Sequence, residues 1–145
     1  MSLDSSGTLD ASKAGSAGSS VQIIAWAYED APNAGQIEYI TPYGATFNAA
    51  TVRNFCPGRP GTLKKMTLLT NSSGHVGTTV VNCQISGVDS ILEITLVNAA
   101  SNTIYSDTDD VTFAATDTIR FKFDGTSHTS GTMRIASVVL EVIWD

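Results

Sequence analysis

Apolar and polar side chains alternate along most of this chain with a period of two, which is typical of β-strands. The alternation is clearest in residues 132–145, where β-branched residues are dense and no Gly or Pro interrupts the run. This stretch predicts a closing strand of about a dozen residues, about 40 Å long at about 3.3 Å per residue. A strand of this length is long for a globular protein, so we expect the domain to be organised around it.

Both faces of the closing strand are apolar. One face carries an unbroken row of apolar residues, namely Ala136, Val138, Leu140, Val142 and Trp144. The opposite face carries Ile135, Val139 and Ile143. A strand that is apolar on both faces is covered on both. We expect the first face to meet the core, and the second to meet either another layer of the same chain or another subunit in a homo-oligomer.

The same rhythm predicts a series of further strands, separated by turn residues at roughly ten-residue spacing. They are expected at residues 21–28, 36–41, 45–55, 62–71, 78–86, 90–97, 102–106, 111–114 and 118–124. A short helical turn at 48–52 is the alternative within one of them, and a polar loop is expected at 125–131. With no convincing helix, the pattern predicts an all-β protein, an antiparallel sandwich or barrel.

The first 20 residues differ in composition from the rest of the chain. Residues 1–20 are dominated by Ser, Gly and Ala, and their few large apolar side chains include Leu3 and Leu9. Such a segment buries too little apolar surface to offset the entropy lost on ordering. We therefore expect an extended N-terminal arm that orders against a neighbouring subunit or another protein, followed by a single β-sandwich domain over residues 21–145.

The chain is acidic and poor in charge. Its 14 Asp and Glu residues against 8 Lys and Arg residues give a net charge of −6, and charged residues make up only 15% of it. Nucleic-acid binding needs clustered Lys and Arg, so this balance argues against nucleic acid as a direct partner. No apolar run has the length of a membrane span, and the N-terminus lacks the pattern of a secretory signal. We expect a soluble protein made in a reducing cytoplasm.

The two cysteines do not form a disulfide framework. Cys83 alternates with Val81 and Ile85, so it is expected to be a buried thiol. A disulfide between Cys83 and Cys56 is the alternative.

Several stretches after residue 60 resemble a jelly-roll module that is common in virion proteins of tailed bacteriophages, including capsid cement (decoration) proteins and fibre heads. The matching stretches are Gly61-Thr62-Leu63, Ile85-Ser86-Gly87-Val88, Leu92-Glu93-Ile94-Thr95-Leu96, Ala115-Thr116-Asp117-Thr118-Ile119 and Ala136-Ser137-Val138-Val139-Leu140. The resemblance covers a little over half of the chain. It implies a jelly-roll fold, a homotrimer and a place in the virion, with the major capsid protein or another virion protein as partner.

No constellation in the sequence predicts catalysis. There is no nucleophile elbow of the G-x-S-x-G type and no phosphate-binding glycine loop. His75 and His128 are isolated in polar stretches, without a Cys or carboxylate at ligand spacing. The acidic residues Asp107, Asp109 and Asp110 favour a solvated turn, with a Ca²⁺ site as the alternative. We expect no enzyme activity, metal or cofactor.

Two hypotheses about function follow. The leading one is a capsid decoration protein that attaches through Leu3 and Leu9 of the arm and oligomerises through Ile135, Val139 and Ile143. The alternative is a receptor-binding fibre head or a carbohydrate-binding module that uses the aromatic residues of the N-terminal third. These aromatic residues are Trp26, Tyr28, Tyr39 and Tyr43. They suit glycan stacking, but core packing or an interface, where aromatic residues are enriched, is the favoured explanation.

Overall fold

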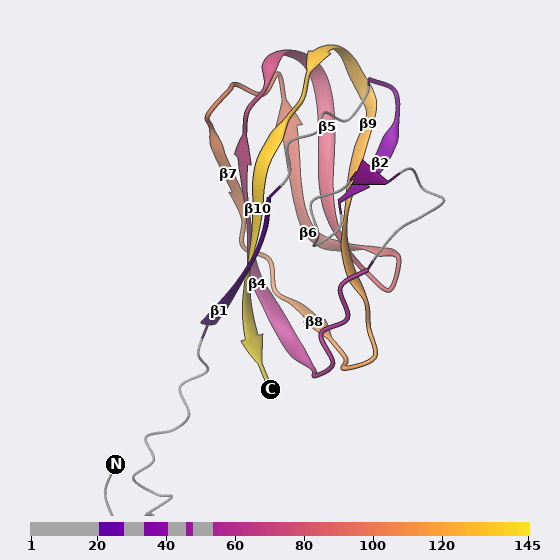
Figure 1. Ribbon diagram of the computed structural model, residues 1–145, viewed down its shortest axis with the longest axis vertical. Helices are drawn as coiled ribbons and strands as arrows, with labels where there is room; N and C mark the ends of the chain where they lie inside the picture. Colours follow the sequence, from indigo (N-terminus) through magenta and orange to yellow (C-terminus); the bar gives the residue numbers. More distant parts are fainter. Residues whose placement is uncertain (1–20, 28–33, 41–45, 48–53) are drawn as a thin grey trace, which may run out of the picture.

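A computed structural model describes residues 21–27, 34–40, 46–47 and 54–145 of the chain. The described residues form two antiparallel sheets that pack face to face (Figure 1). Their strands are β1 (Val21–Ala27), β2 (Ile37–Ile40), β3 (Thr46–Phe47), β4 (Gly61–Thr70), β5 (Ser73–Ile85), β6 (Val88–Val97), β7 (Ile104–Asp107), β8 (Val111–Phe113), β9 (Ile119–Thr132) and β10 (Ile135–Trp144).

The strand order is that of a jelly roll. The first sheet has the order β1-β10-β4-β7, with β8 pairing to the other end of β4, and the second sheet has the order β3-β2-β9-β5-β6. The chain crosses repeatedly between the sheets, and its first and last strands are neighbours in the first sheet. The prediction of an all-β, jelly-roll-like sandwich is therefore confirmed.

The core lies between the two sheets and is made by alternate residues of the long strands. Phe121 and Phe123 of β9 face Leu63, Met66 and Leu68 of β4, and all five side chains are fully buried. Fully burying a large apolar side chain stabilises a fold by about 1.5–3 kcal/mol, so these residues supply much of the driving force for folding.

The closing strand confirms the predicted alternation along most of its length. Val138, Leu140 and Val142 are fully buried, and Trp144 packs against the edge of the core. Ile135, however, is also fully buried, so its expected place on the opposite face was wrong. The register of β10 against β4 shifts between Ile135 and Ser137, and such an irregularity reverses the alternation of faces.

The polar segment at 125–131 is strand rather than loop. β9 continues through it to Thr132, and β5 begins at Ser73 instead of residue 78. The two segments pair with each other over several register irregularities. Glycines permit this close pairing, because an added Cβ on Gly131 would lie only 1.8 Å from the carbonyl oxygen of Gly74.

The two cysteines are both free thiols, so the alternative of a disulfide is not realised. Cys83 is fully buried, as predicted, and burial raises the pKa of its thiol to about 12. Cys56 is exposed. The expected arm over residues 1–20 and the alternative helical turn at 48–52 lie outside the described residues.

Candidate functional site

The outer face of the first sheet is apolar and open. The register places Val21 and Ala25 of β1 beside Ile143 and Val139 of β10, so these four side chains share one face. On the other side of β10, strands β4 and β7 add Leu69, Ile104 and Thr67 to the same face. We call these outward residues, together with Ile23, Lys65 and Glu141, the first-sheet outer face.

Large apolar side chains on this face are exposed to solvent. Ile23 and Ile104 are each 69% exposed and Val21 is 51% exposed, while Val139 and Ile143 are half-buried. β1 does not cover the predicted residues Val139 and Ile143, because it pairs edge to edge with β10 (Figure 1). It widens the apolar face instead. An exposed apolar patch of this kind typically marks an interaction surface.

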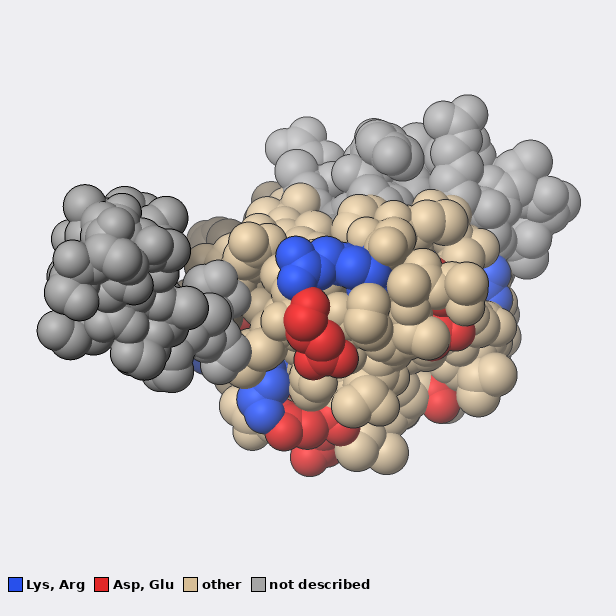
Figure 2. All heavy atoms as spheres, turned by 90° about the horizontal axis from the view of Figure 1, so that it is seen from below, with Lys and Arg blue, Asp and Glu red and all other residues tan. Residues whose placement is uncertain are grey.

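The charges on the first-sheet outer face cancel. Lys65 and Glu141 lie opposite each other in the register, with Nζ and Oε1 3.6 Å apart. The neighbouring Lys64 is paired with Asp110. At the lower end of the sandwich, which is the view in Figure 2, basic and acidic side chains likewise lie next to one another. The face is thus close to neutral, although the whole chain carries −6.

Two of the three carboxylates of the predicted acidic cluster have protein partners. Asp107 accepts hydrogen bonds from the backbone amides of Glu93 and Thr108, and Asp110 pairs with Lys64. Asp109 is exposed. Among the described residues, no group of three acidic, His or Cys side chains is arranged to hold a metal ion. The cluster therefore forms a turn after β7, and its bonds to Glu93 and Lys64 hold this turn against β6 and β4.

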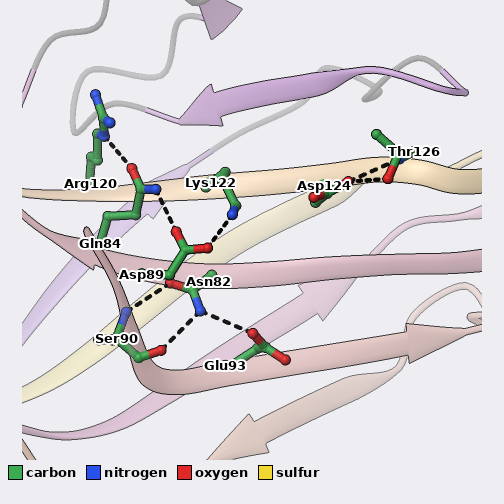
Figure 3. A network of polar contacts seen from close by, with 9 residues as sticks. All are labelled: Asn82, Gln84, Asp89, Ser90, Glu93, Arg120, Lys122, Asp124 and Thr126. Atoms are coloured by element: carbon green, nitrogen blue, oxygen red, sulfur yellow. Dashed lines mark hydrogen bonds and ion pairs between the residues drawn. The ribbon is translucent and has the colours of Figure 1, made fainter. Parts of the chain in front are cut away.

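A polar network occupies the outer face of the second sheet (Figure 3). Arg120 donates from Nε to Gln84 Oε1 over 2.5 Å, and Gln84 donates from Nε2 to Asp89 Oδ1 over 2.5 Å. Asp89 also pairs with Lys122. Burial alone would raise the pKa of Asp89. The hydrogen bonds from Lys122 and Gln84, together with the positive charges of Lys122 and Arg120, outweigh burial and lower this pKa. The network ties β6, β5 and β9 together.

The side chain of Asn82 bridges a place in the second sheet where the pairing of β5 with β6 is irregular. The register of β5 against β6 shifts between Asn82 and Gln84. At this point the side-chain amide of Asn82 donates to the carbonyl oxygen of Ser90 over 3.0 Å and accepts from the Ser90 N–H over 3.2 Å. It also donates to Glu93 over 3.0 Å. The side chain therefore replaces the backbone partner that Ser90 has lost, which gives the network a structural role.

Replacing Asn82 by Ala is expected to lower the free energy of unfolding by about 1–3 kcal/mol, because it leaves the part-buried backbone N–H and carbonyl groups of Ser90 without these partners. Chemical denaturation at fixed protein concentration measures the loss. The matched control is Thr95→Ala, an exposed position on the outer side of β6, for which we expect a change within about 0.5 kcal/mol. Equal effects of the two substitutions would contradict the role assigned to Asn82.

The four candidate aromatic residues do not form one described cluster. Tyr39 lies on β2 in the second sheet, where the guanidinium carbon of Arg120 is 4.5 Å from its ring centroid. Trp26 belongs to β1 in the first sheet. Tyr28 and Tyr43, like Leu3 and Leu9, lie outside the described residues. The polar groups beside Tyr39 are engaged with one another, so this face offers weak support for the glycan-binding alternative.

Two of the turn motifs that carry the phage resemblance meet in space. Ser86 and Gly87 turn the hairpin between β5 and β6, both with positive φ. Ser86 Oγ donates to Asp117 Oδ1 over 2.9 Å, and the Ser86 N–H donates to the Thr118 carbonyl oxygen over 2.7 Å. The backbone N–H of Ala114 donates to the other carboxylate oxygen of Asp117. These motif residues stabilise the two turns and tie them to each other.

Sequence reasoning missed the proximity of the two histidines. His75 and His128 come from β5 and β9, and their ring centroids lie 4.7 Å apart. They were expected in separate loops because the polar sequence around each hides the pairing of these strands. Two histidines in polar segments that could pair antiparallel were the only available signal.

No protein-family model matches the chain, and comparison with curated proteins and with solved structures finds no match either. Within the described residues there is no helix that is long and apolar enough to cross a membrane.

Proposed function

We propose that this protein is a structural virion protein of a tailed bacteriophage, a capsid decoration protein that self-associates through the first-sheet outer face. The observation that supports this most is the combination of exposed Val21, Ile23 and Ile104 with half-buried Val139 and Ile143 on one nearly neutral surface. Covering such a face removes apolar area from water, at about 25 cal/mol per Å².

A second copy of the same chain is the occupant that the charges favour. With a net charge of −6, two copies repel each other unless the surfaces that meet are neutral. The first-sheet outer face meets this condition, because Lys65 and Glu141 balance each other. In a closed ring these two residues can also exchange partners between copies. We favour a trimer, as the resemblance to the phage module implies.

The place in the virion rests on the resemblance and on the type of fold. Jelly rolls recur in capsid proteins, although a fold alone does not establish a function. The charge-poor surface and the polar networks that serve structure suit an adhesive role in which no substrate is turned over. In this proposal the trimeric body sits on the shell, and the arm of residues 1–20 binds the major capsid protein or another virion protein through Leu3 and Leu9.

Removing residues 1–20 is expected to leave the melting temperature unchanged and to weaken binding to the shell by at least about tenfold, since two buried Leu side chains are worth about 1.5–3 kcal/mol each. Co-sedimentation with capsid shells stripped of this protein measures the binding. A double variant, Leu3→Ser with Leu9→Ser, keeps the length of the arm and should weaken binding similarly. Shell binding that is equal with and without the arm would contradict the attachment proposed here.

A further inference from the structure

Two buried histidines meet at one end of the sandwich. His75 and His128 are 4% and 3% exposed, and their rings are tilted by 52° at a centroid distance of 4.7 Å. A charged imidazole in this position would lose its hydration and would face another ring of the same kind. The ring of His75 is therefore expected to be neutral in the folded protein at neutral pH.

The hydrogen bonds of His75 require a neutral ring. Its Nδ1 accepts a hydrogen bond of 2.8 Å from the backbone N–H of Ala99, so this nitrogen carries no proton. The other nitrogen, Nε2, lies 3.1 Å from Thr79 Oγ1 and donates to it in this tautomer. A proton added at Nδ1 would break the bond to Ala99.

His128 has no means of accommodating a second proton. Its Nε2 donates to the Ser130 carbonyl oxygen over 2.7 Å. Its Nδ1 is buried and has no hydrogen-bond partner among the described residues. A proton added there would be a buried donor without an acceptor, and a buried charge beside His75.

The bond from Ala99 to His75 anchors the loop that joins β6 to β7. Ala99 is 4% exposed, and the adjacent Ala100 accepts a hydrogen bond of 2.7 Å from the hydroxyl of Thr70. The backbone N–H of Thr70 donates to the Thr103 carbonyl oxygen over 3.0 Å. The loop then leads directly into Ile104 of β7. Residues 98–103 are further held at the end of the sandwich by Asn98, which exchanges hydrogen bonds of 3.0 and 2.9 Å with Gly77, and by Ser101, whose hydroxyl donates to Asn71. His75 is the titratable group among these anchors.

We propose that His75, packed against His128, forms an acid-sensitive latch, which holds residues 98–103 against the sandwich at neutral pH and loosens them when His75 is protonated. The latch is a property of the single chain and does not depend on self-association.

The pH range follows from the direction of the shift. Burial lowers the pKa of His75 below its usual value of 6.5, and the adjacent His128 lowers it further. His75 therefore binds a proton at a higher pH when the loop is released than when it is latched. The latch is at full strength above about pH 6.5, and it weakens as the pH falls below that value.

Other ionisable groups on the elements around the latch do not titrate in this range or are engaged elsewhere. Residues 98–103 contain none. On β5 the remaining ionisable group is Cys83, whose pKa is raised to about 12. The charged residues of β9 are Arg120, Lys122 and Asp124. Each of them bonds to a partner on the outer face of the second sheet (Figure 3). Arg134, before β10, is exposed.

Hydrogen exchange of the full-length protein, read by mass spectrometry between pH 7.5 and 5.5, tests the latch. After correction for intrinsic rates, the protection of peptides spanning residues 98–103 should fall by about tenfold over this range, as expected for one histidine with a lowered pKa. Peptides of the β4–β10 ladder should keep their protection. The control is the double variant His75→Asn with His128→Gln, which keeps an acceptor near Ala99 and a donor near Ser130.

The double variant contains no histidine, since the chain has only 2. Its loop protection should be independent of pH over the same range. Constant protection in the wild type, or an equal fall in the double variant, would overturn the proposal. If the variant does not fold, an NMR titration of the wild-type imidazoles tests the proposal instead. A titration midpoint for His75 at or above pH 6.5 would also overturn it. All of these readouts are independent of the proposed assembly on a capsid.

Discussion

Replacing Val139 by Asp is expected to weaken self-association by at least about 100-fold and to release folded monomers. Val139 lies near the middle of the first-sheet outer face, between Ala25 on β1 and Thr67 on β4. A carboxylate in a dry interface without a partner costs about 3–5 kcal/mol, which is more than a 100-fold change in affinity requires. The fold should survive, because the side chain points away from the core.

Sedimentation velocity over a range of concentrations measures this effect, with circular dichroism to confirm that the variant is folded. The matched control is Val97→Asp, which places the same charge on β6 of the other sheet, at a side chain that is 60% exposed. We expect the control to associate like the wild type. If both variants dissociate to the same extent, net charge rather than the first-sheet outer face governs assembly.

Replacing Gly131 by Ala is expected to lower the free energy of unfolding by more than about 3 kcal/mol, among the larger losses that a single substitution causes. Gly131 has a φ of 81°, which an L residue adopts only at a cost of about 1–2 kcal/mol. In addition, the new Cβ would lie 1.8 Å from the carbonyl oxygen of Gly74 and 2.8 Å from the backbone nitrogen of His75. Backbone atoms cannot rotate away, so the β5–β9 pairing would have to open.

The control separates strain at φ from the steric clash. Gly58 has a φ of 72°, and a Cβ added there would meet no atom within 4 Å. Gly58→Ala should therefore cost only about 1–2 kcal/mol. Both variants are compared by urea denaturation at one protein concentration, because the proposed self-association would add to the apparent stability. Equal losses for the two variants would show that β5 and β9 do not approach each other as described.

The strand pattern was predictable wherever alternation is regular. Val138, Leu140 and Val142 alternate in the sequence and are buried in the structure. The burial of Ile135 was not predictable, because an irregularity of register leaves no mark in the order of apolar and polar residues. The polar half of β9 was missed for a related reason. Its partner lies about fifty residues earlier in β5, and backbone pairing of Gly, Ser and Thr needs no apolar alternation.

The candidate surface was predictable only in part. The two apolar faces of the closing strand indicated Val139 and Ile143, but a single strand cannot reveal its neighbours. The topology adds Val21 and Ile23 from one end of the sequence and Ile104 from its middle. The same limit applies to His75 and His128, since contact between them depends on long-range strand pairing. Sequence patterns thus indicate faces, and topology determines which faces combine into a site.

Sedimentation equilibrium of the full-length wild-type protein at micromolar concentration tests the central claim most directly. Self-association through the first-sheet outer face predicts a mass that is a multiple of the 15.2 kDa chain, with the trimer favoured. It also predicts that Val139→Asp returns the mass to that of one chain while Val97→Asp does not. A wild-type protein that sediments as a monomer at this concentration, indistinguishable from Val139→Asp, would contradict it.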